Sequence, residues 1–259
     1  MYIKIRGLVL RVTPYNDTDV LLTVLSQDQG KLTVKARGVR RKNSPLVAPC
    51  QLLSYAEFTL FEYRGMYTIN EAQAIELFVG LRSDLQKLAL GTYFAQVAEL
   101  ISQEDTPNPE LLSLVLNSMY ALCNLSVSEE HIKAVFELRI ACIAGYAPDL
   151  SGCIHCGTGL PELLDMSGGH LICDTCRHFT SNGIRMPLSS GMLDAMRYIC
   201  ECPPKQIFSF RIGDETAVGL SYVTEGYLTT QLERGFSTLD FYKSLKNPLE
   251  SFQLGDDHV

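Results

Sequence analysis

Two Cys-x-x-Cys pairs carry the most specific chemistry in the sequence: Cys153-Ile-His-Cys156 and Cys173-Asp-Thr-Cys176. Thiolates suit a tetrahedral zinc ion, and a gap of two residues lets both sulfurs of a pair reach one ion from a tight turn. The sixteen residues between the pairs let the chain reverse and present the second pair to the same ion. Because four thiolates fill the coordination shell, the sequence predicts one structural Zn²⁺ with no open position for a substrate.

Other interpretations of these cysteines remain open at this stage. The four residues could be buried free thiols, whereas a redox pair would need a thioredoxin-like βαβ context that the flanking sequence does not show. One of the nearby histidines, His155, His170 or His178, could replace a cysteine. The remaining cysteines lie in apolar stretches and are interpreted as core or incidental thiols: Cys50, Cys123, Cys142, Cys200 and Cys202.

The composition is that of an ordinary globular protein with one to three domains, since 46% of the 259 residues are apolar and 20% are charged. The first residues, Met1-Tyr-Ile-Lys-Ile-Arg, have no apolar run behind a basic head, and no stretch of eighteen apolar residues predicts a membrane span. With paired ligand spacing as well, we expect a reducing cytoplasm rather than disulfides.

Charge is divided unevenly along the chain. The net charge is −7, yet residues 1–80 hold ten Lys and Arg against seven Asp and Glu, which gives +3 and leaves −10 for the rest. This asymmetry predicts a basic module followed by an acidic one.

The basic module, residues 1–78, has the pattern of a small β-barrel. Five short runs rich in Val, Ile, Leu, Tyr and Thr are separated by turn residues, and they predict strands over residues 2–13, 20–26, 31–39, 52–61 and 66–75. Such a pattern favours an OB-fold, with an SH3-like barrel as the alternative.

The third predicted strand has one cationic face and leads into a cationic loop. Lys31, Thr33, Lys35 and Arg37 alternate with apolar residues, and Arg40-Arg41-Lys42 follow directly. A cationic stripe of this kind could follow a phosphate backbone, although a solvated strand face would look the same.

From residue 79 to residue 259 the apolar period becomes helical. Predicted helices cover residues 81–102, 109–125, about 126–144, 191–200, 217–234 and 238–245, with a zinc module at about 149–186 embedded among them. The predicted fold class is therefore α+β and multidomain: an N-terminal OB-fold barrel followed by an α-helical domain that contains a four-cysteine zinc module.

The whole chain resembles the RecO family of bacterial DNA repair and recombination mediators. The resemblance rests on five segments: Gly30-Lys-Leu-Thr-Val-Lys-Ala-Arg-Gly38 with Arg40-Arg41-Lys42, Phe136-Glu-Leu-Arg139, Gly145-Tyr-Ala-Pro148, Asp149-Leu-Ser-Gly-Cys-Ile-His-Cys-Gly157, and Gly168-Gly-His-Leu-Ile-Cys173. It implies an N-terminal OB-fold, binding to single- and double-stranded DNA, and annealing of complementary strands. It further implies, as partners in the RecFOR pathway, RecR, the C-terminal tail of single-stranded DNA-binding protein and, indirectly, RecA, in the bacterial cytoplasm at the nucleoid.

On this interpretation the chemistry is non-covalent, and the expected DNA-binding residues are the basic ones of the barrel: Lys31, Lys35, Arg37, Arg40, Arg41 and Lys42, with Arg6 and Arg11. An enzyme is not expected, since the sequence has no P-loop and no nucleophile elbow, and Asp17-Thr-Asp19 has the pattern of a turn. The alternative is a zinc-containing scaffold that binds proteins through its helices and has little intrinsic affinity for DNA.

Overall fold

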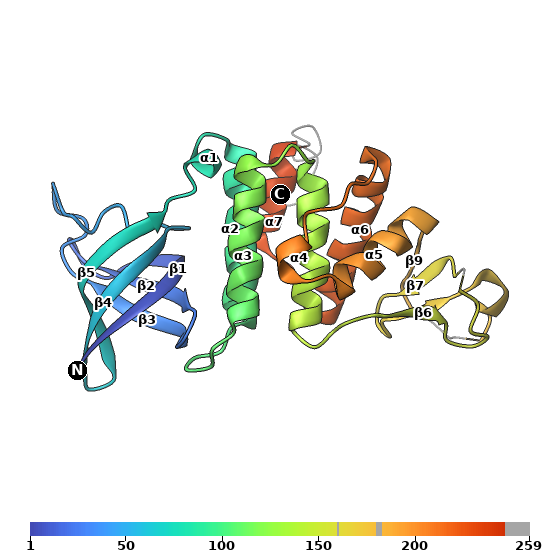
Figure 1. Ribbon diagram of the computed structural model, residues 1–259, viewed down its shortest axis with the longest axis horizontal. Helices are drawn as coiled ribbons and strands as arrows, with labels where there is room; N and C mark the ends of the chain where they lie inside the picture. The colour runs from blue at the N-terminus through green and yellow to red at the C-terminus, as the bar shows by residue number, and fades with distance from the viewer. Residues whose placement is uncertain (160, 180–182, 247–259) are drawn as a thin grey trace, which may run out of the picture. The chain divides into compact units, whose positions relative to one another are not determined.

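The computed structural model describes residues 1–159, 161–179 and 183–246 and divides into two compact units (Figure 1). The first unit contains residues 1–124 and the chain from Phe236, and the second contains residues 125–235. Residues 247–259 of the predicted helical domain lie outside the described part. The predicted domain boundary at residues 78 and 79 does not coincide with this division, and as a boundary between independently folding parts it stays a prediction.

The first unit begins with a closed five-stranded barrel. Its strands are β1 (Tyr2–Pro14), β2 (Val20–Ser26), β3 (Gly30–Ala36), β4 (Tyr55–Tyr63) and β5 (Met66–Glu76), hydrogen-bonded in the order β1-β2-β3-β5-β4 with β4 returning to β1. All pairs are antiparallel except β3 with β5. This confirms the predicted OB-like barrel.

Alternation along β3 sorts its side chains between the core and the surface, as predicted. Leu32, Val34 and Ala36 are buried in the barrel core, whereas Thr33 is exposed and Lys31 and Lys35 are half-buried. The strand ends at Ala36, not at Val39 as predicted, because Gly38 adopts a left-handed conformation (φ 65°) and its carbonyl accepts the Arg41 N–H at 3.1 Å. Arg37 therefore lies in a turn.

Among the described residues of the first unit, four helices follow or rejoin the barrel: α1 (Val79–Arg82), α2 (Leu85–Ile101), α3 (Pro109–Asn124) and α7 (Ser237–Lys246). The single helix predicted from residue 81 to 102 is wrong at its start. Asp84 interrupts it with an extended backbone, and its side chain caps α2 by accepting the N–H groups of Gln86 and Lys87.

Helix α2 contacts both the barrel and Phe236, the residue that precedes α7. Arg11 on β1 pairs with Glu99 at 2.9 Å, and the Lys31 ammonium donates to the Glu99 carbonyl at 3.2 Å. At the other side, Tyr93 packs edge-on against Phe236 with ring centroids 5.5 Å apart. Helix α2 is thus joined to β1 and β3 by polar contacts and to Phe236 by aromatic packing.

The second unit pairs helices α4 (Glu129–Ile143) and α6 (Asp214–Gln231) and adds α5 (Ser190–Glu201). The chain segment that connects α4 to α5 forms a small sheet in the order β6-β8-β7-β9. Its strands are β6 (Asp149–Cys153), β7 (Leu163–Asp165), β8 (His170–Ile172) and β9 (Arg185–Pro187). Short 3-10 turns, η1 (Asp174–Cys176) and η2 (Pro204–Gln206), complete the unit. The sequence did not predict this sheet, because three-residue strands are too short to show a period of two.

Within the described residues, no helix combines the length and the apolar character needed to cross a bilayer.

Candidate functional site

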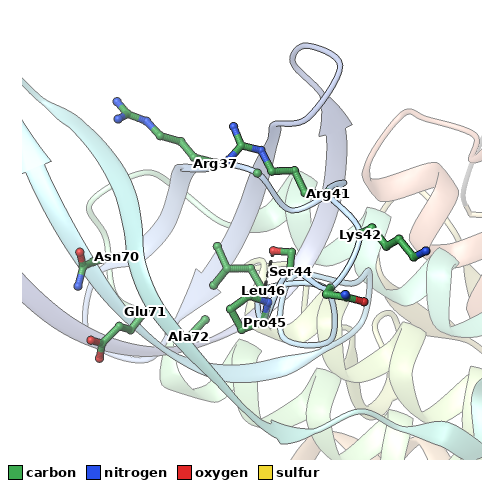
Figure 2. A pocket seen from close by; sticks show the side chains of 11 residues that line it. Arg37, Arg41, Lys42, Ser44, Pro45, Leu46, Asn70, Glu71 and Ala72 are labelled. Carbon is green, nitrogen blue, oxygen red and sulfur yellow. Dashed lines mark hydrogen bonds between the residues drawn. The ribbon is translucent and has the colours of Figure 1, made fainter.

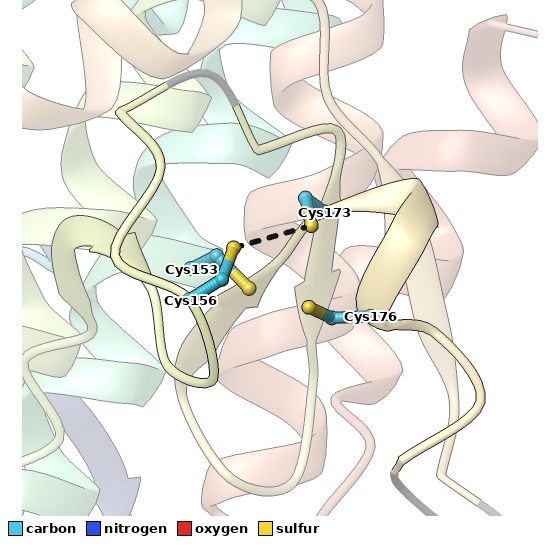
Figure 3. Close-up of side chains that lie close together, drawn as sticks. All are labelled: Cys153, Cys156, Cys173 and Cys176. Atoms are coloured by element: carbon cyan, nitrogen blue, oxygen red, sulfur yellow. Dashed lines mark hydrogen bonds between the residues drawn. The ribbon is translucent and has the colours of Figure 1, made fainter.

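The four cysteines of the two pairs converge on one point in the second unit (Figure 3). Their four Sγ atoms all lie within 4.8 Å of one another, and those of Cys156 and Cys173 are 3.6 Å apart. A tetrahedral ion with metal–sulfur bonds of about 2.3 Å would separate its sulfurs by about 3.8 Å. The group therefore has the ligand number and spacing to hold one metal ion.

Two tight turns present the sulfurs. The first follows β6, where Gly157 adopts a left-handed conformation (φ 73°) and donates its N–H to the Cys153 carbonyl at 2.8 Å. The second follows β8, where η1 closes with the Cys176 N–H on the Cys173 carbonyl at 3.0 Å. Parallel pairing of β6 with β8 places the two turns side by side.

The thiols of the cluster differ in how readily they lose their protons. Burial is the largest effect on the Cys153 thiol and raises its pKa, but backbone groups of Cys173, Cys156 and His155 outweigh it and lower the pKa to about 6. Burial, and next the neighbouring sulfurs, raise the pKa of Cys176 to about 12. A metal ion among the sulfurs would reverse that repulsion, because coordinating thiols lose their protons.

The histidines and the other cysteines lie outside this group. Among the described residues, the set that could hold a metal contains the four cysteines and none of His155, His170 and His178. Cys50 and Cys202 are buried, in line with core thiols. The sequence did not bring Cys142 and Cys200 together, yet their Sγ atoms lie 3.6 Å apart between α4 and α5.

Half of the predicted DNA-binding residues are engaged by partners in the first unit. Arg6 pairs with Glu57 at 3.2 Å, and Lys35 pairs with Asp19 at 3.4 Å. Arg11 and Lys31 bind the carboxylate and the carbonyl of Glu99, as described above. The sequence could not predict these contacts, because each partner comes from a distant part of the chain.

The other predicted residues, Arg37, Arg40, Arg41 and Lys42, form the basic loop (residues 37–42). All four side chains are exposed, and none makes an ion pair within the part of the chain that the structure describes. Four cations on six successive residues therefore face solvent without an ion-pair partner in the described part of the chain, an arrangement that attracts anions.

Asp19 anchors the start of this loop, a role that the sequence did not indicate. Its carboxylate accepts the Gly38 N–H at 2.9 Å and the Asn16 amide at 3.1 Å, and it also contacts Lys35. The Gly38 hydrogen bond is the main reason that the pKa of Asp19 falls to about 2. An ionised Asp19 thus fixes the backbone from which the free arginines project.

Beside the basic loop is a hollow of about 460 Å³, which Figure 2 shows. Arg37 and Arg41 extend from the same side of the loop, whereas Lys42 points in another direction. Asn70 and Glu71 of β5 form the facing wall. The loop thus presents its cations along a wide edge rather than into one closed site.

Two protein-family models match this chain, and together they cover most of its length. A model described as "Recombination protein O N terminal" matches residues 1–78, and one described as "Recombination protein O C terminal" matches residues 82–240. The chain belongs to the RecO family. The predicted family membership is therefore confirmed, and the two matched regions correspond to the barrel and to most of the helical part.

Curated relatives agree along nearly the whole length. The DNA repair protein RecO of Acetivibrio thermocellus is 33% identical over 246 residues, covering 94% of this chain and 97% of that protein. The RecO proteins of Alkaliphilus metalliredigens and Symbiobacterium thermophilum are 29% and 26% identical, over 95% and 94% of this chain and 100% and 98% of their own length. The chain is thus a RecO-family DNA repair protein.

Proposed function

We propose that this RecO-family protein binds single- and double-stranded DNA through the basic loop, anneals complementary strands and, with RecR, helps to load RecA onto strands coated by single-stranded DNA-binding protein. The observation that carries the DNA part is the set of four exposed cations, Arg37, Arg40, Arg41 and Lys42, on an OB-like barrel with no ion-pair partner among the described residues. Phosphates supply the missing counter-charge.

The proposed mechanism is non-covalent and involves no catalytic residue. Arginine side chains would neutralise phosphates and release the counterions condensed on the DNA. Guanidinium groups bind phosphate oxygens and leave the Watson–Crick edges of the bases uncovered. Two strands held in this way could pair with each other, which is the requirement for annealing.

The basic loop is a better candidate for phosphate binding than the other predicted DNA-binding residues. Arg6, Arg11 and Lys35 would have to give up a carboxylate before binding a phosphate, so we place them at the edge of the DNA path. Lys31 is half-buried with its ammonium on a carbonyl, and it belongs with that group.

We also propose that Cys153, Cys156, Cys173 and Cys176 hold one structural Zn²⁺. Four sulfur ligands are typical of structural zinc, and they leave no position for an activated water. In this proposal the ion supports the second unit rather than the DNA chemistry.

The partners and the location rest on the family alone. RecR, the C-terminal tail of single-stranded DNA-binding protein and, indirectly, RecA are proposed as the proteins with which this chain acts, in the bacterial cytoplasm at the nucleoid. A scaffold without intrinsic DNA affinity is the alternative, and the next experiment separates the two.

The test is a titration of labelled single-stranded DNA at several salt concentrations with the wild type and with Arg40→Ala/Arg41→Ala. Each neutralised phosphate contributes about 0.7 log units of affinity per log unit of salt on a single strand. We expect the double variant to bind more weakly and its slope to flatten by roughly 1.4 log units, since two phosphate contacts are lost.

The matched control is Lys4→Ala/Arg64→Ala, which removes the same charge from two exposed positions of the barrel outside the loop. If both double variants flatten the salt slope equally, DNA binding depends on the net charge of the barrel and not on the basic loop. A wild type that binds no DNA at low salt would favour the scaffold.

A further inference from the structure

A second hollow also borders the basic loop, within the first unit, and we call it the valine pocket. It has a volume of about 600 Å³, which is in the range of sites for small organic groups. Its apolar wall comes from β1, β2, the basic loop itself and the chain after the loop: Val12, Val20, Val39 and Val47. Three arginines also line it: Arg40, Arg41 and Arg82.

The arginines give the pocket a chemical preference. None of the three makes an ion pair within the described residues. Arg82 is nevertheless held in place, because its Nη2 donates to the Leu52 carbonyl at 2.9 Å. A guanidinium has five N–H donors, so most of them remain available to a ligand. The complementary ligand is an apolar group with an anion attached nearby.

Arg41 connects this pocket to the proposed DNA path. It lines both the valine pocket and the hollow of Figure 2, where it lies beside Arg37. A strand whose phosphates follow the basic loop would therefore pass the mouth of the valine pocket. A nucleotide matches the pocket as well, since its base has apolar faces and its phosphate is an anion.

From this geometry we propose that the valine pocket receives one unpaired base of a DNA strand whose phosphates lie on Arg40, Arg41 and Arg82. The proposal rests on the DNA binding proposed above and goes beyond it by naming the part of the nucleotide that is bound. Gln51, half-buried in the pocket wall, offers an amide to the edge of that base. A paired base stacked in a duplex cannot enter, so the pocket favours single strands.

The experiment compares two strands with the same backbone charge: twenty deoxythymidines, and the same length with all internal bases replaced by abasic tetrahydrofuran. We expect the wild type to bind the base-bearing strand about tenfold more tightly, because the faces of one base leave water and pack on the valine side chains of the pocket. The salt slope should be the same for both strands. This comparison needs no variant.

The variant is Val47→Phe, which fills the pocket from a side chain that is already 41% exposed and so should not disturb the core. We expect it to remove the tenfold preference without changing the salt slope. The matched control is Val218→Phe, an equal change on the exposed face of α6 in the other unit, which should keep the preference.

Three results would overturn the proposal and would be distinguishable. Equal binding of both strands with a steep salt slope would leave the phosphate path intact and remove the base from the pocket. A preference that survives in Val47→Phe would place the base contact elsewhere. Binding of the peptide acetyl-(Asp-Leu)₃-amide that is lost in Val47→Phe, with both strands bound equally, would assign the pocket to a protein partner. Failure of both strands to bind at any salt would instead defeat the proposed function itself.

Discussion

Asp19 is the acidic residue on which the geometry of the basic loop depends most directly. Its carboxylate accepts the Gly38 N–H at 2.9 Å, and Gly38 lies in the turn that follows the end of β3 at Ala36. It also contacts Lys35, which lies over the Tyr15 ring with 4.1 Å between ammonium and centroid. The Asp19 carboxylate thus forms an ion pair with Lys35 and, through Gly38, fixes the backbone that carries the arginines of the basic loop.

We predict that Asp19→Asn lowers the stability of the barrel in a pH-dependent way. The pKa of Asp19 is lowered from 3.8 to about 2, so the ionised form is favoured by the fold. That contribution is fully present above pH 3.8 and is lost as the pH falls through 2. Urea unfolding of both proteins between about pH 6 and pH 2 should give a difference that is constant at the upper end and shrinks below about pH 4.

Asp17→Asn is the control for that measurement, because it removes the same charge from an exposed neighbour in the same turn. If the two variants follow the same pH profile, the hydrogen bond to Gly38 is not the source of the effect.

The packing of α4 against α6 contains a buried ionic cluster. The Lys133 ammonium lies 2.9 Å from Glu137 and 2.8 Å from Glu225, and it donates to the Ser221 carbonyl at 3.3 Å. Thr224 donates to Glu137 at 2.9 Å. Burial raises the pKa of Glu137, and Lys133 opposes that rise. Lys133 thus contacts both carboxylates and offsets the cost of burying Glu137.

Lys133→Ala should destabilise the second unit by about 3–5 kcal/mol, because it removes the ammonium that contacts the fully buried carboxylate of Glu137. Denaturant unfolding followed by circular dichroism would measure the change. Lys205→Ala, an exposed position in the same unit, is the control and should have little effect. A loss below about 1 kcal/mol for Lys133→Ala would contradict a structural role for the cluster.

Strands and helices with a strong apolar period could be predicted from the sequence. Three-residue strands, and a helix start that only a capping residue marks, could not. The alternation along β3 identified its buried face, since Leu32 and Val34 point into the core. The break at Asp84 was missed, because an apolar helical period continues across it and only the cap marks the new start. The three-residue strands β7 and β8 were missed, although the cysteines that they help to place were identified.

For the proposed DNA-binding surface, the sequence predicted which residues carry the positive charge. It did not predict which of them are already paired with a carboxylate. Charge and spacing identified the basic loop, but nothing local to Arg6 or Arg11 indicates that Glu57 and Glu99 pair with them. Likewise, the valine pocket combines Val12 with Arg82, seventy positions apart in the sequence. Such combinations depend on tertiary contacts that a single sequence does not reveal.

Over the whole molecule, the two proposed chemistries belong to different units. The basic loop and the valine pocket are in the first unit, and the cysteine cluster is in the second. Loss of the metal should therefore affect stability in one unit and leave DNA binding in the other largely intact.

We expect protein purified without chelators to contain one zinc ion per chain, as measured by metal analysis. In Cys173→Ser, amide hydrogen exchange should accelerate in residues 125–235 while the barrel strands keep their protection, and the salt slope of DNA binding should not change. Cys123→Ser, a cysteine outside the cluster, is the control. Absence of metal, or equal loss of protection in both units, would refute this division.

The first unit is built from two separate segments of the chain, residues 1–124 and the segment from Phe236, and the second unit lies between them in the sequence. The second segment packs against α2 through Phe236 and α7. During synthesis on a ribosome, residues 125–235 emerge as one uninterrupted stretch and can fold as soon as they are exposed. The first unit must wait for α7, so until then the face of α2 that receives Phe236 is uncovered. Premature termination anywhere in the second unit would thus damage the first as well.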